Sequence, residues 1–280
     1  MDLSGLGRCG RRVRSRLAAG LALLVLASHA EARTVLRRAP RVHRSTNVSQ
    51  RKRLNVNDLI AAPGTVELDW GSLYSYTTGS VTLPSAIRYT PDGGSLLRGR
   101  TEYSVAFDSI SSAVNTTSRS TQFSDRLTFA ATSVVYESEH FDIAFAPQVT
   151  KLLRNDSGLR LGATTIARYD GGGNTIGVIG SWTGATTASD TNPAGTWDIG
   201  GGFGRQLAAK GVWSKVTPHT NVTLERSTGF QKTLAVFGGV AYQFTDRFTA
   251  DVSGQRFGLI GGGEDRQLLV SFTLNLGKMQ

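Results

Sequence analysis

Cysteine and long apolar runs are nearly absent from this sequence, and each shortage excludes a class of protein. The single cysteine, Cys9, excludes a disulfide framework and a cysteine zinc site. The longest apolar run, Leu17–Ala27, has eleven residues, whereas a membrane-spanning helix needs about 20. Charged residues make up only 19% of the 280 residues, below the typical quarter. A protein with several transmembrane helices is therefore excluded.

Acidic residues are missing from the stretch 33–53, which contains eight Arg or Lys residues. This stretch explains much of the formal charge of +10, because residues 54–280 contain 18 basic and 19 acidic residues. A nucleic-acid-binding domain would show a basic face on its folded part. The body of this chain is nearly neutral, so nucleic acid is not an expected partner.

The first 32 residues have the three parts of a secretory signal peptide. Five arginines between Arg8 and Arg16 form a positive region, and Leu17–Ala27 forms the apolar region. The triplet Ala30-Glu31-Ala32 matches a cleavage site, so we expect cleavage after Ala32. The mature chain would then contain no cysteine. The alternative is a helix of the folded core at the N-terminus.

The body of the chain alternates between apolar and polar residues. In the last segment Leu268, Val270, Phe272 and Leu274 share one face, and the residues between them are mostly polar. A period of two over ten residues indicates a strand with one apolar and one polar face. Twelve segments show this pattern: 65–76, 79–90, 98–110, 122–136, 139–151, 157–169, 173–184, 194–206, 215–227, 231–244, 247–258 and 264–276.

The predicted strands are long and no convincing amphipathic helix accompanies them. Most segments have ten to fifteen residues, whereas strands of globular proteins usually have about 5–6 and tilted membrane-spanning strands about 9–11. A closed barrel in lipid hides both the strand edges and the apolar faces. The fold class predicted is therefore an all-β, antiparallel, transmembrane up-and-down β-barrel of about 12 strands, within a range of 10 to 14. A secreted soluble β-sandwich is the alternative.

The connections between the predicted strands mostly alternate between short and long, as expected for such a barrel. Short connections include Asp170–Gly173 and Thr245-Asp246, and long ones include Ser111–Thr121 and Gly184–Pro193. Aromatic residues gather near the short connections, which is typical of an interfacial aromatic girdle. These residues are Tyr89, Tyr136, Phe141, Tyr169, Tyr242, Phe244 and Phe248.

Three segments carry a family resemblance: the opening Pro63–Leu68, the turn Tyr242–Arg247 and the last strand Arg266–Gly277. With the export signal, they make residues 63–277 similar to outer-membrane barrels of the MetA-pathway-of-phenol-degradation family. The resemblance implies a barrel of about twelve strands that passes small, often aromatic, molecules. The basic arm 33–53 and the C-terminus, which lacks a terminal aromatic residue, depart from that family's pattern.

No set of residues has the spacing of a catalytic or metal site. His140, beside Glu139 and Asp142, comes nearest to a catalytic histidine, and a solvated turn histidine explains it better. No His or carboxylate pair has metal-ligand spacing. The glycine clusters are not placed between a strand and a helix, so they do not predict a nucleotide site. We expect no enzyme activity, no catalytic residues, no metal and no cofactor.

The polar faces of the strands carry the informative chemistry. Eight acids and four arginines point away from the apolar side, so many of them can pair across the lumen. Such pairs form a narrow, nearly non-selective passage or fill the barrel with ion pairs, because twelve strands lie between plugged eight-stranded barrels and open porins. The candidate lumen-lining residues are Glu67, Asp69, Arg88, Glu102, Asp108, Arg126, Asp142, Arg160, Arg168, Asp198, Glu225 and Asp251.

The sequence therefore predicts three parts: a signal peptide (1–32), a flexible basic arm (33–62) and an outer-membrane barrel (63–277). The basic stretch is either a solvated leader or a segment that binds anionic lipid, lipopolysaccharide or cell-wall polymer. Expected partners are outer-membrane lipid and lipopolysaccharide, the barrel-assembly machinery and an unidentified small solute.

The function expected is a narrow passive channel or transporter for small solutes, including hydrophobic or aromatic ones, in the bacterial outer membrane. The alternative is a structural or surface-interaction barrel with a plugged lumen. An outer-membrane hydrolase ranks third.

Overall fold

The computed structural model describes residues 60–92, 100–115, 118–123, 126–153, 158–188, 194–229, 231–260 and 264–278, without the side chains of 108–115, 118–123 and 278. The expected signal peptide, its cleavage site and the basic stretch 33–53 lie outside these residues. All the described residues belong to one compact unit, Ala39–Gln280.

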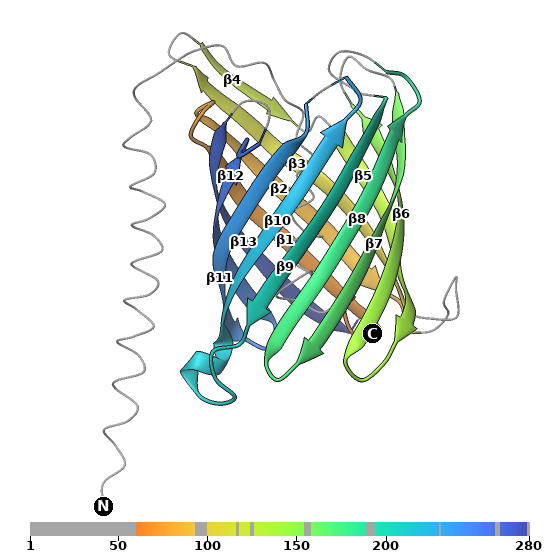
Figure 1. Cartoon of the computed structure of the whole chain (residues 1–280), viewed down its shortest axis with the longest axis vertical. Helices are drawn as coiled ribbons and strands as arrows, with labels where there is room; N and C mark the ends of the chain where they lie inside the picture. The colour runs from red at the N-terminus through yellow and green to blue at the C-terminus, as the bar shows by residue number, and fades with distance from the viewer. Residues whose placement is uncertain are drawn as a thin grey trace, which may run out of the picture. The chain divides into compact units, whose positions relative to one another are not determined.

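The described part of the chain is built almost entirely of antiparallel strands (Figure 1). A single turn of 3-10 helix, η2 (Val212–Lys215), precedes β10. No helix among the described residues is both long and apolar enough to cross a membrane. The strands are β1 (Thr65–Ser75), β2 (Ser80–Thr90), β3 (Thr101–Asn115), β4 (Ser118–Phe123), β5 (Arg126–Glu137), β6 (Phe141–Leu152), β7 (Leu159–Gly171), β8 (Asn174–Ala185), β9 (Gly195–Arg205), β10 (Val216–Ser227), β11 (Thr233–Thr245), β12 (Phe248–Phe257) and β13 (Asp265–Lys278).

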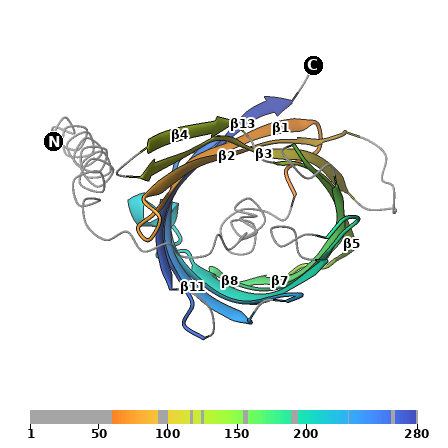
Figure 2. The same cartoon turned by 90° about the horizontal axis from the view of Figure 1, so that it is seen from above.

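Twelve of these strands form a closed barrel, which confirms the predicted fold class and strand number. Each strand pairs with its neighbour in sequence, except that β3 pairs with β5, and β1 pairs with β13 to close the ring. Figure 2 shows this ring from above. Closure leaves the barrel wall without a free edge, which satisfies the backbone hydrogen bonds that an open sheet would expose.

Strand β4 was not predicted. Residues 110–115 of β3 pair with β4, beyond the residues of β3 that pair with β5. The segment 111–121, expected as a long connection, is therefore largely a hairpin that extends one side of the barrel. The polar, serine-rich sequence of β4 shows no alternation of apolar and polar residues, because this hairpin has no apolar face to bury.

We call the end of the barrel that holds Thr65 and Lys278 the terminal end, and the other the opposite end. At the terminal end the β7–β8 connection is the two-residue turn Gly172-Gly173, and both residues have positive φ. Two residues with positive φ match the twist of a tight hairpin, and glycine adopts that conformation at little cost. The expected turn at Asp170–Gly173 is thus shorter than predicted, and Asp170 belongs to β7.

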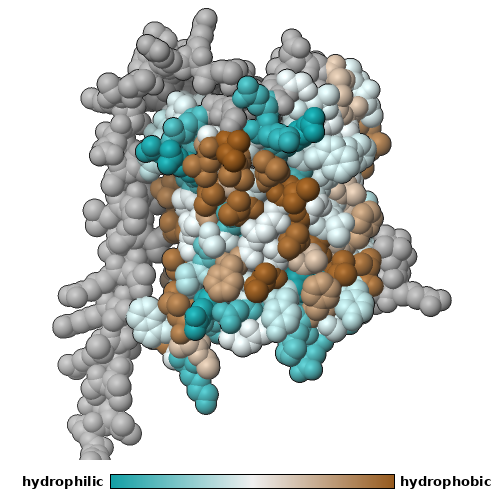
Figure 3. Space-filling model, in the orientation of Figure 1, coloured by the Kyte–Doolittle hydropathy of each residue, from teal (hydrophilic) through white to brown (hydrophobic). Residues whose placement is uncertain are grey.

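Large apolar side chains are exposed at alternate positions of the strands, as on Ile87, Phe129, Val178, Ile199 and Val222. Figure 3 shows apolar residues over the strand bodies and much of the hydrophilic surface near the two ends. A water-soluble sandwich would bury these side chains, whereas lipid solvates them. The outer face of the barrel is therefore suited to a hydrocarbon environment.

Aromatic rings contact one another on the outer face near the terminal end. Trp70, Phe248 and Phe272 come from β1, β12 and β13, with ring centroids 5.6 Å apart for Trp70–Phe272 and 6.0 Å for Phe248–Phe272. Phe244 of β11 lies 5.4 Å from Phe248. Phe244 and Phe248, which flank a short turn, thus belong to an aromatic cluster that also contains Trp70 of β1, a strand distant in sequence. Such a belt is typical of the membrane–water interface.

Candidate functional site: the inner wall of the barrel

The structure describes the side chains of eleven of the twelve residues expected to line the lumen. All eleven are buried or half-buried and lie in the inward phase of their strands. Asp108 lies on β3 opposite Pro84 of β2, and its side chain is outside the described part. The eleven are Glu67 and Asp69 on β1, Arg88 on β2, Glu102 on β3, Arg126 on β5, Asp142 on β6, Arg160 and Arg168 on β7, Asp198 on β9, Glu225 on β10 and Asp251 on β12.

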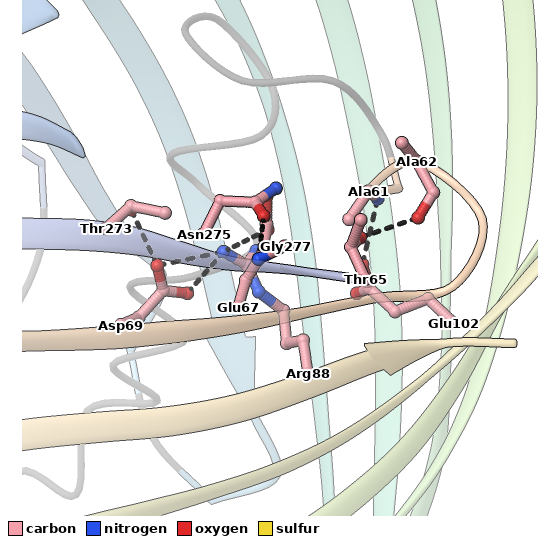
Figure 4. Close-up of polar contacts among 10 residues, drawn as sticks. All are labelled: Ala61, Ala62, Thr65, Glu67, Asp69, Arg88, Glu102, Thr273, Asn275 and Gly277. Atoms are coloured by element: carbon pink, nitrogen blue, oxygen red, sulfur yellow. Dashed lines mark hydrogen bonds and ion pairs between the residues drawn. The ribbon is translucent and has the colours of Figure 1, made fainter. Parts of the chain in front are cut away.

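Arg88 is the centre of an ion-pair cluster near the terminal end (Figure 4). Its Nη2 atom lies 3.0 Å from Glu67 Oε2 and 2.8 Å from Asp69 Oδ2. Glu67 is directly opposite Arg88 in the β1–β2 register, and Asp69 is the next residue on that face. Arg88 is only 2% exposed, so the two carboxylates offset the cost of burying its charge.

Strand β13 adds hydrogen bonds to the same carboxylates. Thr273 Oγ1 donates to Asp69 Oδ1 at 2.6 Å, and Asn275 Nδ2 donates to Glu67 Oε1 at 3.4 Å. Figure 4 shows these side chains together on the inner wall. The cluster therefore joins β2, β1 and β13 across the seam where the first and last strands meet.

Residues ahead of β1 turn toward the inner wall. The backbone N–H of Ala61 donates to Glu102 Oε2 at 3.1 Å, and Ile60 is 2% exposed. Gly64 makes this turn with φ of +76°, and a Cβ there would lie 2.5 Å from the Asp92 carboxylate. The positive φ therefore favours glycine at the point where the chain turns from the inner wall into β1, whereas the Asp92 side chain could move aside.

His219 and Asp251 form a second buried pair. His219 Nε2 and Asp251 Oδ2 are 2.5 Å apart, and their side chains are 7% and 3% exposed. The two residues lie on β10 and β12, so the histidine reaches across β11, where Gly239 and Ala241 provide the space. His219 Nδ1 makes no hydrogen bond with a described residue, so the pair lacks the serine contact that nucleophilic catalysis would use.

Substituting alanine for Gly239 is expected to destabilise the barrel by about 1–3 kcal/mol. A Cβ at this position would lie 2.6 Å from Ser253 Cβ, 2.7 Å from the Val252 carbonyl oxygen and 2.9 Å from His219 Cε1. Urea titration of the folded barrel in detergent measures the change.

The neighbouring glycine provides a matched control for that substitution. A Cβ at Gly238 meets nothing within 4 Å, so Gly238→Ala is expected to change stability by less than about 0.5 kcal/mol. Equal effects of the two substitutions would contradict the tight contact at Gly239.

Two further polar groups lie along β7. Near the terminal end Arg168 Nε is 2.6 Å from Asp170 Oδ2, and Thr175 Oγ1 donates to Asp170 Oδ1 at 2.6 Å. Toward the opposite end, Arg160 donates to Thr183 and Thr196, at 3.0 and 3.1 Å. Arg160 is therefore tied to β8 and β9, and Arg168 is linked to β8 through Asp170 of its own strand.

Sequence reasoning missed three polar residues on the inner face: Asp170, His219 and Asp265. Asp265 accepts hydrogen bonds from Ser75 at 2.9 Å and from Gln267 at 2.6 Å. Each of the three lies two residues from another inward residue of its strand. Continuing the alternation by one more pair of residues would therefore have predicted it to face inward. Asp170 falls in the expected turn Asp170–Gly173, and His219 and Asp265 lie near the ends of the predicted segments 215–227 and 264–276, where periodicity does not separate strand from turn.

With these additions, the inner face has more acidic than basic side chains. The described strands place at least nine carboxylates on it, including Asp170 and Asp265, against four arginines, so acids outnumber arginines by at least five; Glu137 of β5, opposite Asp142, adds to the acidic side. The nine are Glu67, Asp69, Glu102, Asp142, Asp170, Asp198, Glu225, Asp251 and Asp265, and the four are Arg88, Arg126, Arg160 and Arg168.

The inner face also has apolar patches, although the alternation of the strands predicts a polar face. Ala144, Ile166 and Ile179 form one buried cluster on β6, β7 and β8. Phe237 and Phe257 form another with Ala235, their rings edge to face with centroids 5.7 Å apart. An inward apolar residue falls in the same phase as its polar neighbours, so alternation by itself does not reveal it.

Other candidates for chemistry are separate from these groups. His140 lies in the β5–β6 turn with its side chain 56% exposed, 3.8 Å from Glu139. No three metal-ligating side chains of the described residues come together.

The fold resembles that of outer-membrane porins and channels. The COG4313 outer membrane channel from Pseudomonas putida F1 is 10% identical, with a TM-score of 0.56 over 79% of this chain and 98% of that one. The NanC porin is 8% identical, with a TM-score of 0.53 over 75% and 100%. The KdgM porin in complex with disordered oligogalacturonate is 8% identical, with a TM-score of 0.52 over 75% and 99%. At these identities the likeness shows the fold alone.

Sequence comparison does not extend this likeness to a particular family. No family model matches the chain, and no curated protein matches it. The resemblance to the MetA-pathway-of-phenol-degradation family is therefore not confirmed, whereas the resemblance to outer-membrane barrels is.

Proposed function

We propose that this protein is a narrow passive channel for small solutes in the bacterial outer membrane. The observation that carries the proposal is the closed twelve-stranded wall, with exposed apolar side chains outside and charged side chains on the inner face. Channels and porins share this fold. The expected signal peptide with cleavage after Ala32, the assembly machinery and the surrounding lipid and lipopolysaccharide belong to the same proposal.

The passage is narrow because the inner wall is crowded. Arg88, Glu102 and Ile166 are each 1–2% exposed, although they face the inside of a twelve-stranded barrel. In an open pore of that strand number, long inner side chains would contact water. Crowding at this level favours small solutes over large sugars.

The charge of the inner face favours cations over anions. The sequence suggested nearly non-selective conductance, and the carboxylates added by the structure change that expectation. The KdgM porin has been captured with oligogalacturonate, an acidic oligosaccharide. We do not propose a solute of that class for this chain, because its surplus carboxylates would repel one.

Hydrophobic or aromatic solutes are the finer part of the proposal. The pairs Ile166–Ile179 and Phe237–Phe257 place apolar side chains on the inner face beside its charged groups, and each of these side chains is 8% exposed or less. Apolar surface with a few polar groups is typical of sites for small molecules. This chemistry agrees with the solutes that the family resemblance implies.

In planar bilayers the folded protein is expected to conduct weakly and to prefer cations. In liposome swelling, small neutral solutes should enter faster than large sugars. Asp142→Ala should lower the cation preference and Arg126→Ala should raise it, because each removes one charge from the inner face. The reversal potential in a salt gradient measures both changes. A correctly folded barrel that shows neither current nor swelling, with or without these substitutions, would contradict the channel.

The alternative function is a structural or surface-interaction barrel with a plugged lumen. The burial of Ile60 and Ala61 against the inner wall favours it. The same recordings decide between the two functions, because a permanently plugged barrel passes neither ions nor solutes.

A further inference from the structure

The β9–β10 connection is long for a turn at its end of the barrel. The turns Gly172-Gly173 and Asp246-Arg247 at the terminal end have two residues each, whereas residues 206–215 separate β9 from β10. Short turns mark the periplasmic end of an outer-membrane barrel, so joining the two strands does not explain this length. Figure 1 shows η2, the last part of the connection, beyond the strands at this end, and Figure 2 shows it at the wall of the ring and not over the lumen.

The connection has a fixed conformation and is attached to the aromatic cluster of the outer face. Gln206 Nε2 donates to the Ser214 carbonyl, and Ser214 Oγ donates to the Gly211 carbonyl, both at 2.7 Å. Lys215 Nζ donates at 3.4 Å to the carbonyl of Phe244, a member of the aromatic cluster. The connection is therefore held beside the aromatic belt, where the hydrocarbon of a bilayer meets its headgroups.

Trp213 is the most prominent side chain of this connection. It is 63% exposed, as much as Ile199 on the lipid-facing wall, and Leu207 at the start of the connection is 46% exposed. A tryptophan has a large apolar ring and one N–H donor, so it is favoured where apolar and polar surroundings meet. Its exposure on a fixed segment beside the aromatic belt therefore fits the boundary between acyl chains and headgroups.

Basic side chains accompany Trp213 at this end. Residues 205–215 contain three basic residues and no acid. The neighbouring turn Asp246-Arg247 adds an exposed arginine and one acid, which leaves a net charge of about +3 and attracts anionic headgroups. We call this surface the basic rim, and it consists of Arg205, Lys210, Trp213, Lys215 and Arg247.

The positive charge is confined to one side of the terminal end. At the β5–β6 turn, residues 137–140 contain Glu137 and Glu139 and no Lys or Arg. Arg100 pairs with Glu137 at 2.6 Å, so this side keeps no surplus of positive charge. An anionic lipid is therefore attracted to the barrel at β9–β12 and not at β5–β6.

We propose that the basic rim binds the headgroup of an anionic phospholipid in the periplasmic leaflet. Its basic side chains lie at the level of the lipid phosphate, and Trp213 lies at the boundary with the acyl chains. Such a contact holds this side of the barrel at a fixed depth, as interfacial Trp, Lys and Arg anchors do. The proposal rests on the membrane location given under the proposed function, but not on conduction through the lumen.

Lipid titration of the full chain, folded in a nonionic detergent and followed by native mass spectrometry, tests the headgroup preference. Phosphatidylglycerol should bind about fivefold or more tightly than phosphatidylcholine. Lys210→Gln combined with Arg247→Gln should weaken phosphatidylglycerol binding about tenfold or more, and should leave phosphatidylcholine binding unchanged.

Two basic residues at the opposite end provide the matched control. Lys232 and Arg256 are also exposed, so Lys232→Gln combined with Arg256→Gln removes the same charge away from the basic rim. This pair should leave phosphatidylglycerol binding unchanged. Equal affinities for the two lipids, or equal losses from the two pairs of substitutions, would overturn the proposal.

Tryptophan fluorescence in nanodiscs tests the position of Trp213. Its emission is the difference between the unsubstituted full chain and Trp213→Phe, measured in discs that contain a small fraction of brominated lipid. Brominated phosphatidylglycerol should quench this emission more strongly than the same fraction of brominated phosphatidylcholine. The difference should shrink at about 1 M NaCl, where the Debye length is ~3 Å. Absence of quenching by either lipid, or equal quenching by both, would overturn the proposal.

Two further results separate this proposal from its neighbours. Displacement of phosphatidylglycerol by an equal concentration of inorganic phosphate would assign the basic rim to a free anion and overturn the lipid site. A chain that does not insert into nanodiscs at all would contradict the membrane location, and with it the proposed function. A barrel that inserts and conducts but shows no lipid preference would overturn the lipid site alone.

Discussion

Arg88→Met is expected to destabilise the folded barrel by about 3–5 kcal/mol, the cost of leaving buried charges without their partner. Arg88 is 2% exposed and lies 3.0 Å or less from two carboxylates. Methionine fills much of the same volume, so the loss reports mainly on charge. Urea titration in detergent or lipid vesicles, followed by heat-modifiable gel mobility, measures it.

Two further variants separate the charge effect from a general loss of contacts. Glu67→Gln and Asp69→Asn, added to Arg88→Met, should recover much of the lost stability because they remove the uncompensated charges. Arg256→Met is the matched control, since Arg256 is 3.0 Å from Glu264 but both are about half exposed. Its effect should stay below about 1 kcal/mol. Similar effects of Arg88→Met and Arg256→Met would contradict the importance of the buried cluster.

Val178→Arg is expected to cost about 2–4 kcal/mol of stability in lipid, as for a charge on the lipid face near the bilayer midplane. Val178 lies near the middle of β8 and is 54% exposed on the outer face. In a membrane, that exposure means contact with acyl chains, which do not solvate a guanidinium group. Folding into phosphatidylcholine vesicles, with urea titration of the folded fraction, measures the difference.

Val212→Arg is a matched control for this substitution. Val212 has the same side chain and the same exposure of 54%, but it lies in the 3-10 turn η2 that connects β9 and β10. We expect a change below about 0.5 kcal/mol, because this turn lies outside the strands that cross the membrane. Equal tolerance of arginine at the two positions would indicate that the outer face is solvated by water, as in a soluble sandwich.

The strands could be read from the sequence because alternation is a local property. A half-buried strand needs an apolar residue at every second position, and segments such as 139–151 and 264–276 match β6 and β13 closely. Closure followed from the same pattern, since long strands with apolar outer faces have no other way to satisfy their edges in lipid. Strand β4 could not be read, because its serine-rich sequence has no apolar face.

The phase of each strand also placed the charged residues on one face, but it did not show which of them meet. Glu67 and Arg88 contact because the β1–β2 register sets them opposite each other. His219 meets Asp251 only because β11 lies between their strands and has small residues there. Register and the identity of neighbouring strands depend on the whole ring, so no local pattern encodes these contacts.

Three properties depend only on neighbouring residues and are determined by the sequence: the period of two, the basic arm and the signal-like N-terminus. Periodicity is enough to predict a barrel, and the local composition is enough to give the positive charge of the arm. The seam between β1 and β13, the reach of His219 across Gly239 and the inward turn at Ile60–Ala61 belong to the tertiary structure. They join residues far apart in the chain, such as Asp69 and Thr273, whose distance is set only when the first and last strands pair and the barrel closes.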